Sequence, residues 1–316
     1  MQINYKQTAD FLKDCDNVYI LTHQSPDGDC IGTGFALRDI LGKMGKKSAV
    51  LCSDPFPGKF DFITDVDNDA DFIPDTVIAV DVADTKLLGK YEEIYGERID
   101  LCIDHHISNT GYAERTLLGA DSAAACEVLY RLVRTMDAEL SDYAAQCIYT
   151  GIATDTGCFK FENTSAETHE IAAELMRRHK INHAKINREM FDIKTKGMLK
   201  MECSVIEVME YYLDNRLTMI CITREMLDRL GVDYSELDGC ASIPLKVEGV
   251  EVGITIKEKA EGEYKISMRS AGDVNVSAIC QSVGGGGHAK AAGCALKGSL
   301  EEVKKILVEA VRKALP

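Results

Sequence analysis

Short apolar runs alternate with amphipathic segments along the first part of the chain. The apolar runs are each followed by polar residues, and they lie at 18–22, 48–52, 76–82 and 99–103. Apolar residues at helical spacing cover 30–44, 122–136, 141–150, 166–178 and 181–190. Short buried strands that alternate with helices are typical of a parallel sheet covered on both faces, so this part of the chain predicts an α/β fold.

The pattern changes after residue 190. The next residues are charged with helical spacing, which predicts a connection between two domains. Beyond them, three runs alternate as half-buried strands do, and they cover 217–223, 250–256 and 264–269. A final helix is predicted over 300–315. We therefore predict an α/β domain at 1–190, a helical linker at 191–212 and a smaller α+β domain at 213–316.

Composition narrows the class of protein. The 316 residues carry a formal net charge of −15, whereas a protein that grips long nucleic acid needs a basic face. We therefore expect a small substrate and no long duplex partner. The first residues do not resemble a signal peptide, and no apolar run approaches a bilayer span, so we expect a cytoplasmic protein without a membrane partner. The twelve cysteines include no C-x-x-C pair, which favours reduced cysteines over a zinc ribbon.

The most informative residues are acids and histidines in four places along the first domain. They are His23, Asp27 and Asp29, then Asp81, then Asp104, His105 and His106, and finally Asp155. Several of them follow strand-like runs, and open α/β sheets place ligands at the carboxyl ends of their strands. Carboxylate oxygen together with imidazole nitrogen suits divalent transition ions such as Mn²⁺, Fe²⁺, Co²⁺ or Zn²⁺.

This number of ligands fits two ions better than one. Two ions that share a carboxylate and a water lower the pKa of that water and hold the attacking and leaving oxygens of a phosphoryl group. A single ion would leave several carboxylates unpaired, which is costly if they are buried. Taken one at a time, the acids have simpler explanations, since Asp29 suits a helix N-cap and Asp81 or Asp155 suits a turn.

A glycine-rich stretch, 284–293, is the second distinctive feature. It reads GGGGHAKAAG, and its glycines let the backbone approach a ligand and offer N–H groups to an anion. It is not a P-loop, because no G-K-[ST] follows, and a plain glycine hinge is the alternative. The small residues after His288 predict a tightly packed helix or turn.

These motifs, in this order, resemble the DHH phosphoesterases over nearly the whole chain. The resemblance is to the short two-domain members that act as nanoRNases and pAp phosphatases and are relatives of the RecJ exonuclease. It implies a DHH catalytic domain in which His23, Asp27 and Asp81 bind one ion. Asp29, Asp81, His105 and Asp155 would bind the other, and Asp81 would bridge. It also implies that Asp104 holds His105 in the right tautomer and that His106 faces the substrate phosphate. The family usually works with Mn²⁺.

The same resemblance assigns the glycine stretch to the GGGH motif of the domain that accompanies DHH catalytic domains. It implies that Gly285, Gly286, Gly287 and His288 hold the terminal phosphate or the nucleotide. Arg269 would contribute a basic group from the neighbouring strand, although taken alone it is an ordinary exposed strand residue. Ser122 resembles a substrate-side position, with a simple N-cap as the alternative.

The predicted activity is therefore two-metal hydrolysis of short oligonucleotides or of pAp, by in-line attack. Among nanoRNA, pApA, cyclic di-AMP and pAp the sequence does not choose. The oligomeric state stays open, with a homodimer among the alternatives. Three rivals remain. The first is a family II inorganic pyrophosphatase or exopolyphosphatase, against which the glycine–histidine motif argues. The second is a nucleotide-binding sensor without turnover, against which the intact ligand set argues, and the third is a long-substrate exonuclease like RecJ, against which the acidic net charge argues.

Overall fold

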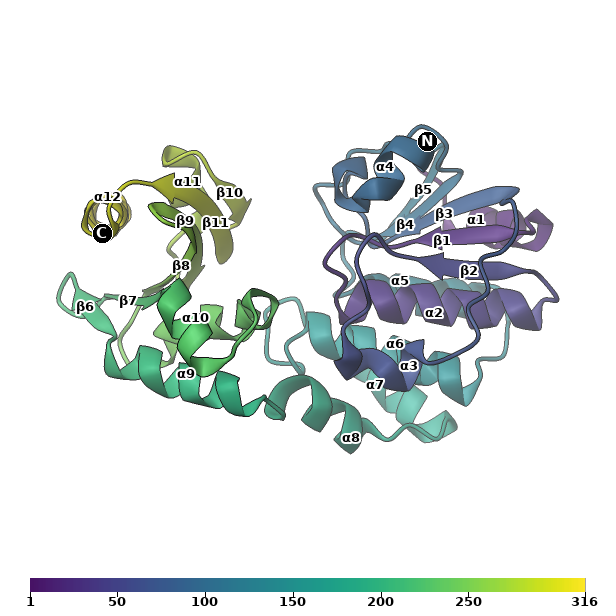
Figure 1. Cartoon of the computed structure of the whole chain (residues 1–316). Coiled ribbons are helices and arrows are strands. Elements are labelled where there is room, and N and C mark those ends of the chain that lie inside the picture. The colour runs from purple at the N-terminus through teal and green to yellow at the C-terminus, as the bar shows by residue number, and fades with distance from the viewer. Residues whose placement is uncertain (316) are drawn as a thin grey trace. The chain divides into compact units, whose positions relative to one another are not determined.

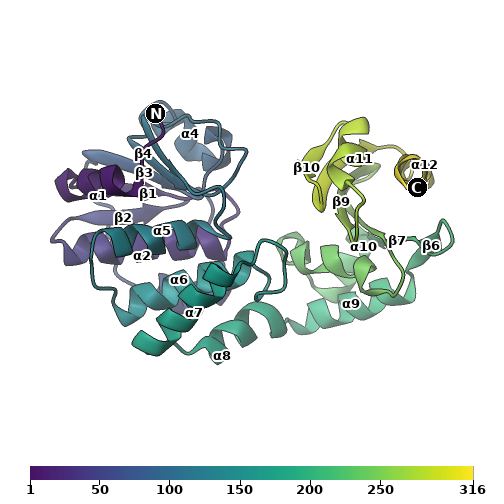
Figure 2. The same cartoon turned by 180° about the vertical axis from the view of Figure 1, so that it is seen from behind.

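The chain folds into two compact units, Met1–Ile193 and Lys194–Pro316, shown in the computed structural model of Figures 1 and 2. We call them the N-terminal and the C-terminal unit. The structure describes residues 1–315, without the side chains of Ser235, Asp238 and His288. Within that range, no helix combines the length and the apolar character that crossing a membrane requires.

The N-terminal unit is built on a five-stranded parallel sheet in the order β2-β1-β3-β4-β5. Its strands are β1 (Val18–Leu21), β2 (Ser48–Leu51), β3 (Thr76–Val80), β4 (Leu101–Asp104) and β5 (Arg115–Leu118). The central strands β1, β3 and β4 are buried along their whole length, as the apolar runs predicted. Strand β5 is an addition to the predicted elements.

Helices cover both faces of this sheet, which confirms the predicted α/β architecture. They are α1 (Tyr5–Asp14), α2 (Gly28–Lys43), α3 (Asp61–Thr64), α4 (Lys90–Tyr95), α5 (Ala125–Thr135), α6 (Asp142–Asp155), α7 (Ala166–Arg178) and α8 (His183–Asn187), with a π-helical turn at Arg188–Asp192 and short 3₁₀ turns at Gly58–Phe60 and Thr85–Leu88. Helices α2 and α5 lie against one face, with α6 and α7 beyond them, and α4 lies on the opposite face (Figures 1 and 2). Alternate strand residues enter the two cores, for example Ile20 and Ile78 on one face and Tyr19 and Val77 on the other.

The C-terminal unit is a six-stranded mixed sheet in the order β10-β11-β9-β8-β7-β6. Its strands are β6 (Glu210–Tyr212), β7 (Leu217–Ile222), β8 (Val252–Ala260), β9 (Glu263–Ser270), β10 (Gly286–His288) and β11 (Ala291–Lys297). Its helices are α9 (Lys196–Glu207), α10 (Arg224–Leu230), α11 (Val276–Ser282) and α12 (Leu300–Ala314), with 3₁₀ turns at Tyr234–Ser242 and Pro244–Lys246. Among the described strands of this sheet, β7 and β8 pair in parallel and the other neighbours pair antiparallel. This is the predicted α+β architecture.

Two features of this unit differ from the sequence pattern. Strand β9 alternates between buried and more exposed residues as predicted, but β7 and β8 are buried almost throughout. The reason is that one face of these strands packs on α11 and α12 while the other packs on α9 and the 3₁₀ turns. In the segment predicted as a linker, Met198, Met201 and Val205 of α9 are buried against Ile220 of β7, so α9 packs in the core of the C-terminal unit.

Candidate metal centre

The predicted metal-binding residues of the N-terminal unit meet at the carboxyl edge of its sheet. His23 follows β1 by two residues, Asp81 comes directly after β3, and Asp104 is the last residue of β4. These three strands are neighbours in the sheet, so their ends are adjacent. This confirms the expectation that the predicted site residues gather where the parallel strands end.

Two helices bring the remaining acids to this edge. Asp27 is the N-cap of α2, where its carboxylate accepts from the backbone N–H groups of Asp29 and Cys30 at 3.0 and 3.1 Å. Asp29 lies inside the first turn of α2, so the N-cap explanation belongs to Asp27 and not to Asp29. Asp155 is the last residue of α6, and not part of a loop turn.

Glycines allow α2 and α6 to approach closely enough for Asp29 and Asp155 to meet. A Cβ at Gly28 would lie 2.3 Å from Thr154 Oγ1, and one at Gly32 would lie 2.5 Å from the Cys147 carbonyl oxygen. These glycines were not among the predicted site residues, although their spacing of four residues along one helix was the available signal.

His105 stands at the centre of one half of the cluster. Its Nε2 lies 3.8 Å from Asp29 Oδ2, 3.5 Å from Asp81 Oδ1 and 3.4 Å from Asp155 Oδ2. Its Nδ1 is 3.2 Å from the carbonyl oxygen of Ser122 and therefore donates a proton to it. This hydrogen bond fixes the tautomer that leaves the Nε2 lone pair facing three carboxylates.

His23 plays the equivalent part in the other half. Its Nε2 lies 3.6 Å from Asp27 Oδ1 and 3.7 Å from Asp81 Oδ2. Its Nδ1 donates to the carbonyl of Gln24 at 2.8 Å, so the same tautomer is selected. The carboxylate of Asp81 therefore faces both histidines, one with each oxygen. Cys30 also brings its sulfur close to His23 and Asp27, a neighbour that the sequence analysis missed.

The two central acids are deeply buried and held in unusual ways. Asp29 is fully buried and accepts from the backbone N–H groups of Ala125 and Cys126, at 2.6 and 2.9 Å, at the N-terminus of α5. Asp81 is 3% exposed and has a φ of 58°, which is uncommon for a residue other than glycine. Asp81 Oδ1 is buried, and no hydrogen bond reaches it among the described residues.

Crowding of like charges is visible in the acidity of the cluster. Burial and the neighbouring carboxylate of Asp81 raise the pKa of Asp29 to about 7. Burial, followed by the carboxylates of Asp29 and Asp81, raises the pKa of Asp155 to about 10. The protein alone thus supplies too little positive charge for its own acids.

This arrangement fits divalent cations. An orphaned buried carboxylate oxygen, acids with raised pKa values and imidazole lone pairs directed at them are what a cation at this position would satisfy. The mixed nitrogen and oxygen donors suit first-row transition ions. His23, Asp27, Asp29, Asp81, His105 and Asp155 are the residues that would hold them.

Asp104 orients His106, and the prediction that it would orient His105 is wrong. Its Oδ1 accepts from Nδ1 of His106 at 2.8 Å, and also from the backbone N–H groups of both histidines. The reason is that His105 turns its Nδ1 away, toward Ser122. Asn109, which the sequence analysis missed, donates to Asp104 Oδ2 at 2.6 Å. The hydrogen bond to Asp104 raises the pKa of His106 to about 9.

Ser122 is buried and contacts the cluster through His105. The N-cap of α5 is Ala124, so Ser122 does not cap that helix. Its carbonyl holds His105, and its hydroxyl accepts from Nη1 of Arg131 at 3.0 Å. The structure therefore gives this residue a role in supporting His105, and its assignment to the substrate stays a prediction.

In the C-terminal unit, the glycine-rich stretch forms a tight hairpin of β10 and β11, so the predicted turn is followed by a strand and not by a helix. A Cβ at Gly285 would lie 2.2 Å from the carbonyl oxygen of Gly293, and Gly287 has a φ of 141° with Ala292 Cα at 2.6 Å from such a Cβ. At Gly286, by contrast, no described atom beyond its chain neighbours comes within 4 Å of the Cβ position. Packing thus requires two of the three predicted glycines.

Arg269 of β9 pairs with Ala291 of β11, which in turn pairs with His288 of β10. The register therefore places 269, 291 and 288 in one row across three neighbouring strands. The guanidinium of Arg269 donates to the carbonyl of Met268 at 3.2 Å. The side chain of His288 lies outside the described residues, so its phosphate-binding role stays a prediction.

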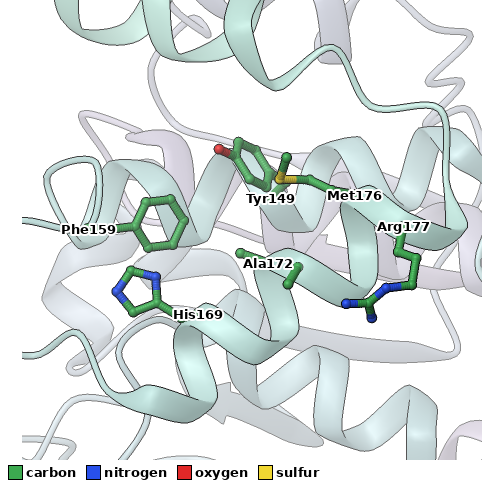
Figure 3. A pocket seen from close by; sticks show the side chains of 7 residues that line it. Tyr149, Phe159, His169, Ala172, Met176 and Arg177 are labelled. Atoms are coloured by element: carbon green, nitrogen blue, oxygen red, sulfur yellow. The ribbon is translucent and has the colours of Figure 1, made fainter.

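A surface pocket of about 470 Å³ lies elsewhere in the N-terminal unit, over α7. Figure 3 shows Phe159 and His169 at one end of this pocket and Arg177 at the other, with Ala172 between them. The rings of Phe159 and His169 are stacked, with centroids 5.2 Å apart. None of the predicted site residues lines the pocket, so the metal cluster is a separate feature.

Comparisons with known proteins bear on both units. Residues 17–152 match the DHH family, N-terminal domain, and residues 218–315 match the DHHA1 domain. A Thermus thermophilus protein named bifunctional oligoribonuclease and PAP phosphatase NrnA is 29% identical, over 97% of this chain and 93% of its own length.

Two solved structures share the fold. A crystal structure of an exopolyphosphatase-related protein from Bacteroides fragilis has a TM-score of 0.90 at 25% identity, and covers 98% of this chain and 95% of that one. RecJ from Thermus thermophilus, solved in complex with Mn²⁺, has a TM-score of 0.58 at 13% identity, over 99% of this chain and 55% of that one. The DHH match covers all the predicted metal ligands except Asp155 and the DHHA1 match covers the glycine hairpin, so the chain carries a DHH domain followed by a DHHA1 domain.

Proposed function

We propose that this chain is a metal-dependent phosphoesterase that hydrolyses short oligonucleotides and pAp, with two divalent ions, Mn²⁺ by preference. The observation that carries the proposal is the shared position of Asp81, whose buried carboxylate faces His23 with one oxygen and His105 with the other. The name of the Thermus relative, similar over nearly the full length of both chains, supports the substrate class.

Ions bound at this cluster would supply positive charge to phosphoryl oxygens and lower the pKa of a water nucleophile. His23, Asp27 and Asp81 would hold one ion, and Asp29, Asp81, His105 and Asp155 the other. The protein's own contribution is to fix these ligands before any substrate arrives: each of the two histidines is locked in one tautomer by a backbone carbonyl, and Asp29 is held by the N-terminus of α5.

His106 is suited to the leaving side of the reaction. Its Nδ1–H is held by Asp104, so Nε2 is the ring atom available to a substrate oxygen. The hydrogen bond to Asp104 raises the pKa of His106 to about 9 in the metal-free protein, which favours a proton on Nε2 that can be donated. Asn109 and the backbone keep the Asp104 carboxylate in place for this role.

The net charge of −15 favours short substrates over long ones, because a long strand needs an extended basic track. We propose that the glycine hairpin and Arg269 bind the substrate's terminal phosphate. The rival pyrophosphatase or exopolyphosphatase activity is a specific alternative to be tested, since the Bacteroides structure is titled exopolyphosphatase-related.

The test is a turnover panel with Mn²⁺ on pApA, pAp, a long single-stranded RNA, pyrophosphate and polyphosphate. We expect hydrolysis of the first two and little of the others. A matched pair of variants comes from the two ends of α6. Asp155→Asn should abolish turnover, whereas Asp142→Asn, at the exposed first turn, should leave it unchanged. Preferential hydrolysis of pyrophosphate or polyphosphate would overturn the proposal. Binding of pAp without hydrolysis of any substrate, whichever divalent ion is added, would also overturn it.

A further inference from the structure

The turn before α5, at residues 122–124, and the first residues of that helix contact two predicted metal ligands, His105 and Asp29. The carbonyl of Ser122 fixes the tautomer of His105 through a 3.2 Å hydrogen bond. The N–H groups of Ala125 and Cys126 hold both oxygens of Asp29, at 2.6 and 2.9 Å. The conformation of this short segment therefore sets the positions of His105 and Asp29 together.

A fully buried glutamate, Glu127, forms a hydrogen bond with this segment. Glu127 has 0% exposure, and its Oε2 accepts from the N–H of Ala123 at 3.2 Å and from the hydroxyl of Thr168 at 3.0 Å. Its Oε1 accepts from Nη2 of Arg131 at 2.8 Å. These three hydrogen bonds join the carboxylate to the turn before α5, to α7 and to Arg131.

Arg131 forms a second hydrogen bond with the turn before α5, through Ser122. Its Nη1 donates to the hydroxyl of Ser122 at 3.0 Å, and the carbonyl of the same residue fixes His105. Its Nε and Nη2 form a two-point contact with Glu167 at the start of α7, at 2.9 and 2.8 Å. The guanidinium thus ties the turn to two helices at once.

A gain in folding stability is a poor explanation for the Glu127–Arg131 ion pair. Removing charges from water is costly, and well-packed apolar side chains in place of a buried pair are often neutral or stabilising. The directed hydrogen bonds of the pair, in contrast, cannot be replaced by apolar groups. Two of those bonds end on Ser122 and Ala123, which belong to the segment that places His105 and Asp29.

We infer that Glu127 and Arg131 are positioning residues for one of the two cations, the one assigned to Asp29, His105 and Asp155. The inference rests on the proposed two-cation function and adds an asymmetry to it. In the part of the chain that the structure describes, no hydrogen bond joins the turn before α5 to His23 or Asp27. Loss of the pair therefore weakens binding of one cation and spares the other.

The test measures Mn²⁺ binding to the metal-free, full-length protein by titration calorimetry and by the electron paramagnetic resonance of free Mn²⁺, with no substrate. The main variant is Glu127→Met with Arg131→Met, which removes both charges together. We expect one dissociation constant to rise about 10–100-fold and the other to stay unchanged, the range found for partners that orient metal ligands. The metal-free variant should keep a single cooperative unfolding transition, although the buried N–H of Ala123 and the hydroxyl of Thr168 lose Glu127 as an acceptor.

The matched control is Arg134→Met with Glu174→Met. This pair also joins α5 to α7, at 2.8 Å, but lies one turn further along α5 and more exposed. Both dissociation constants should match the wild type. If the main variant does not fold, Ser122→Ala decides, because it removes only the hydroxyl that Arg131 contacts and should weaken the same cation several-fold.

Wild-type affinity for both ions in the folded main variant, or in Ser122→Ala, would overturn the inference. Equal weakening of both ions would also overturn it, since the asymmetry would be absent. A wild-type protein that binds no Mn²⁺ beyond what Asp81→Asn binds would instead refute the proposed function. The two failures are therefore told apart by the wild-type titration alone.

Discussion

The metal cluster of the N-terminal unit and the glycine hairpin of the C-terminal unit were both predicted from the sequence, but packing explains the residues of the hairpin and not those of the cluster. In the cluster, packing does not explain why Asp81 has a buried oxygen that no described hydrogen bond reaches, or why four candidate acidic ligands lie together at one edge of the sheet. In the hairpin, close backbone contacts account for Gly285 and Gly287 without any ligand. Unsatisfied buried charge thus points to function more directly than glycine content does.

The largest effect that we expect comes from Asp81→Asn. Asparagine tolerates the positive φ of this position, so the backbone is not strained. Because the shared carboxylate loses its charge, kcat/KM on pApA should fall about 1000-fold, equivalent to several kcal/mol of lost charge stabilisation. The metal-free variant should be at least as stable as the wild type in thermal unfolding, and a large loss of its melting temperature would mean that Asp81 serves packing after all.

A smaller effect is expected from Asp104→Asn. The new amide must place its NH₂ against either Asn109 or the N–H groups that Asp104 now accepts. In either orientation His106 loses the negatively charged hydrogen-bond partner that raises its pKa to about 9, so the basic limb of the pH–rate profile should move to lower pH. We expect kcat to fall about 100-fold, the usual contribution of a general acid. An unshifted profile would show that His106 does not donate the proton.

The contrast between the two regions also describes what sequence reasoning achieves. Strands β1 to β4 of the N-terminal unit were predicted, because the central ones are continuous apolar runs, and so were helices α2 and α5 to α8, whereas α1, α3 and α4 were not. Strands β10 and β11 were not predicted, since they are rich in Gly and Ala and owe their conformation to pairing with β9. Edge strand β5, with two buried residues, gave a similarly weak signal.

At the site, the residue types and their strand-end positions were predictable, but the hydrogen bonds between them were not. The chain order Asp104-His105-His106 does not reveal that the carboxylate turns to His106 and leaves His105 to Ser122. Nor does it reveal Asn109, Glu127 or Arg131, whose roles depend on how loops and helices pack. These contacts are set by tertiary structure over distances that periodicity does not encode.

Removal of metal should expose the charge crowding of the cluster through pH. Asp29 and Asp155 have folded pKa values of about 7 and about 10, above the ordinary value of 3.8. Such groups stabilise the fold fully below the ordinary pKa and lose that stabilisation as pH rises through the folded value. The metal-free protein should therefore melt at least about 5 °C lower at pH 8.5 than at pH 6.

Two controls keep this prediction specific to the cluster. Added Mn²⁺ should reduce the pH dependence, because the cation supplies the missing charge. Asp29→Asn should reduce it as well, since one of the crowded carboxyls is gone. A metal-free protein that melts at the same temperature at both pH values would show that the acids are less crowded than the geometry indicates.

The smallest effects, and the sharpest test of the comparison, come from two neighbouring glycines. Gly285→Ala forces a methyl group into the backbone of Gly293 and should destabilise the C-terminal unit by about 1–3 kcal/mol, whereas Gly286→Ala has room and should change stability by less than about 0.5 kcal/mol. Denaturant unfolding measures both. If the hairpin only packs, the KM of Gly286→Ala stays at the wild-type value. If the hairpin binds the substrate phosphate as we propose, KM for pApA rises in Gly286→Ala at unchanged stability, because the space beside this glycine is where the ligand would lie.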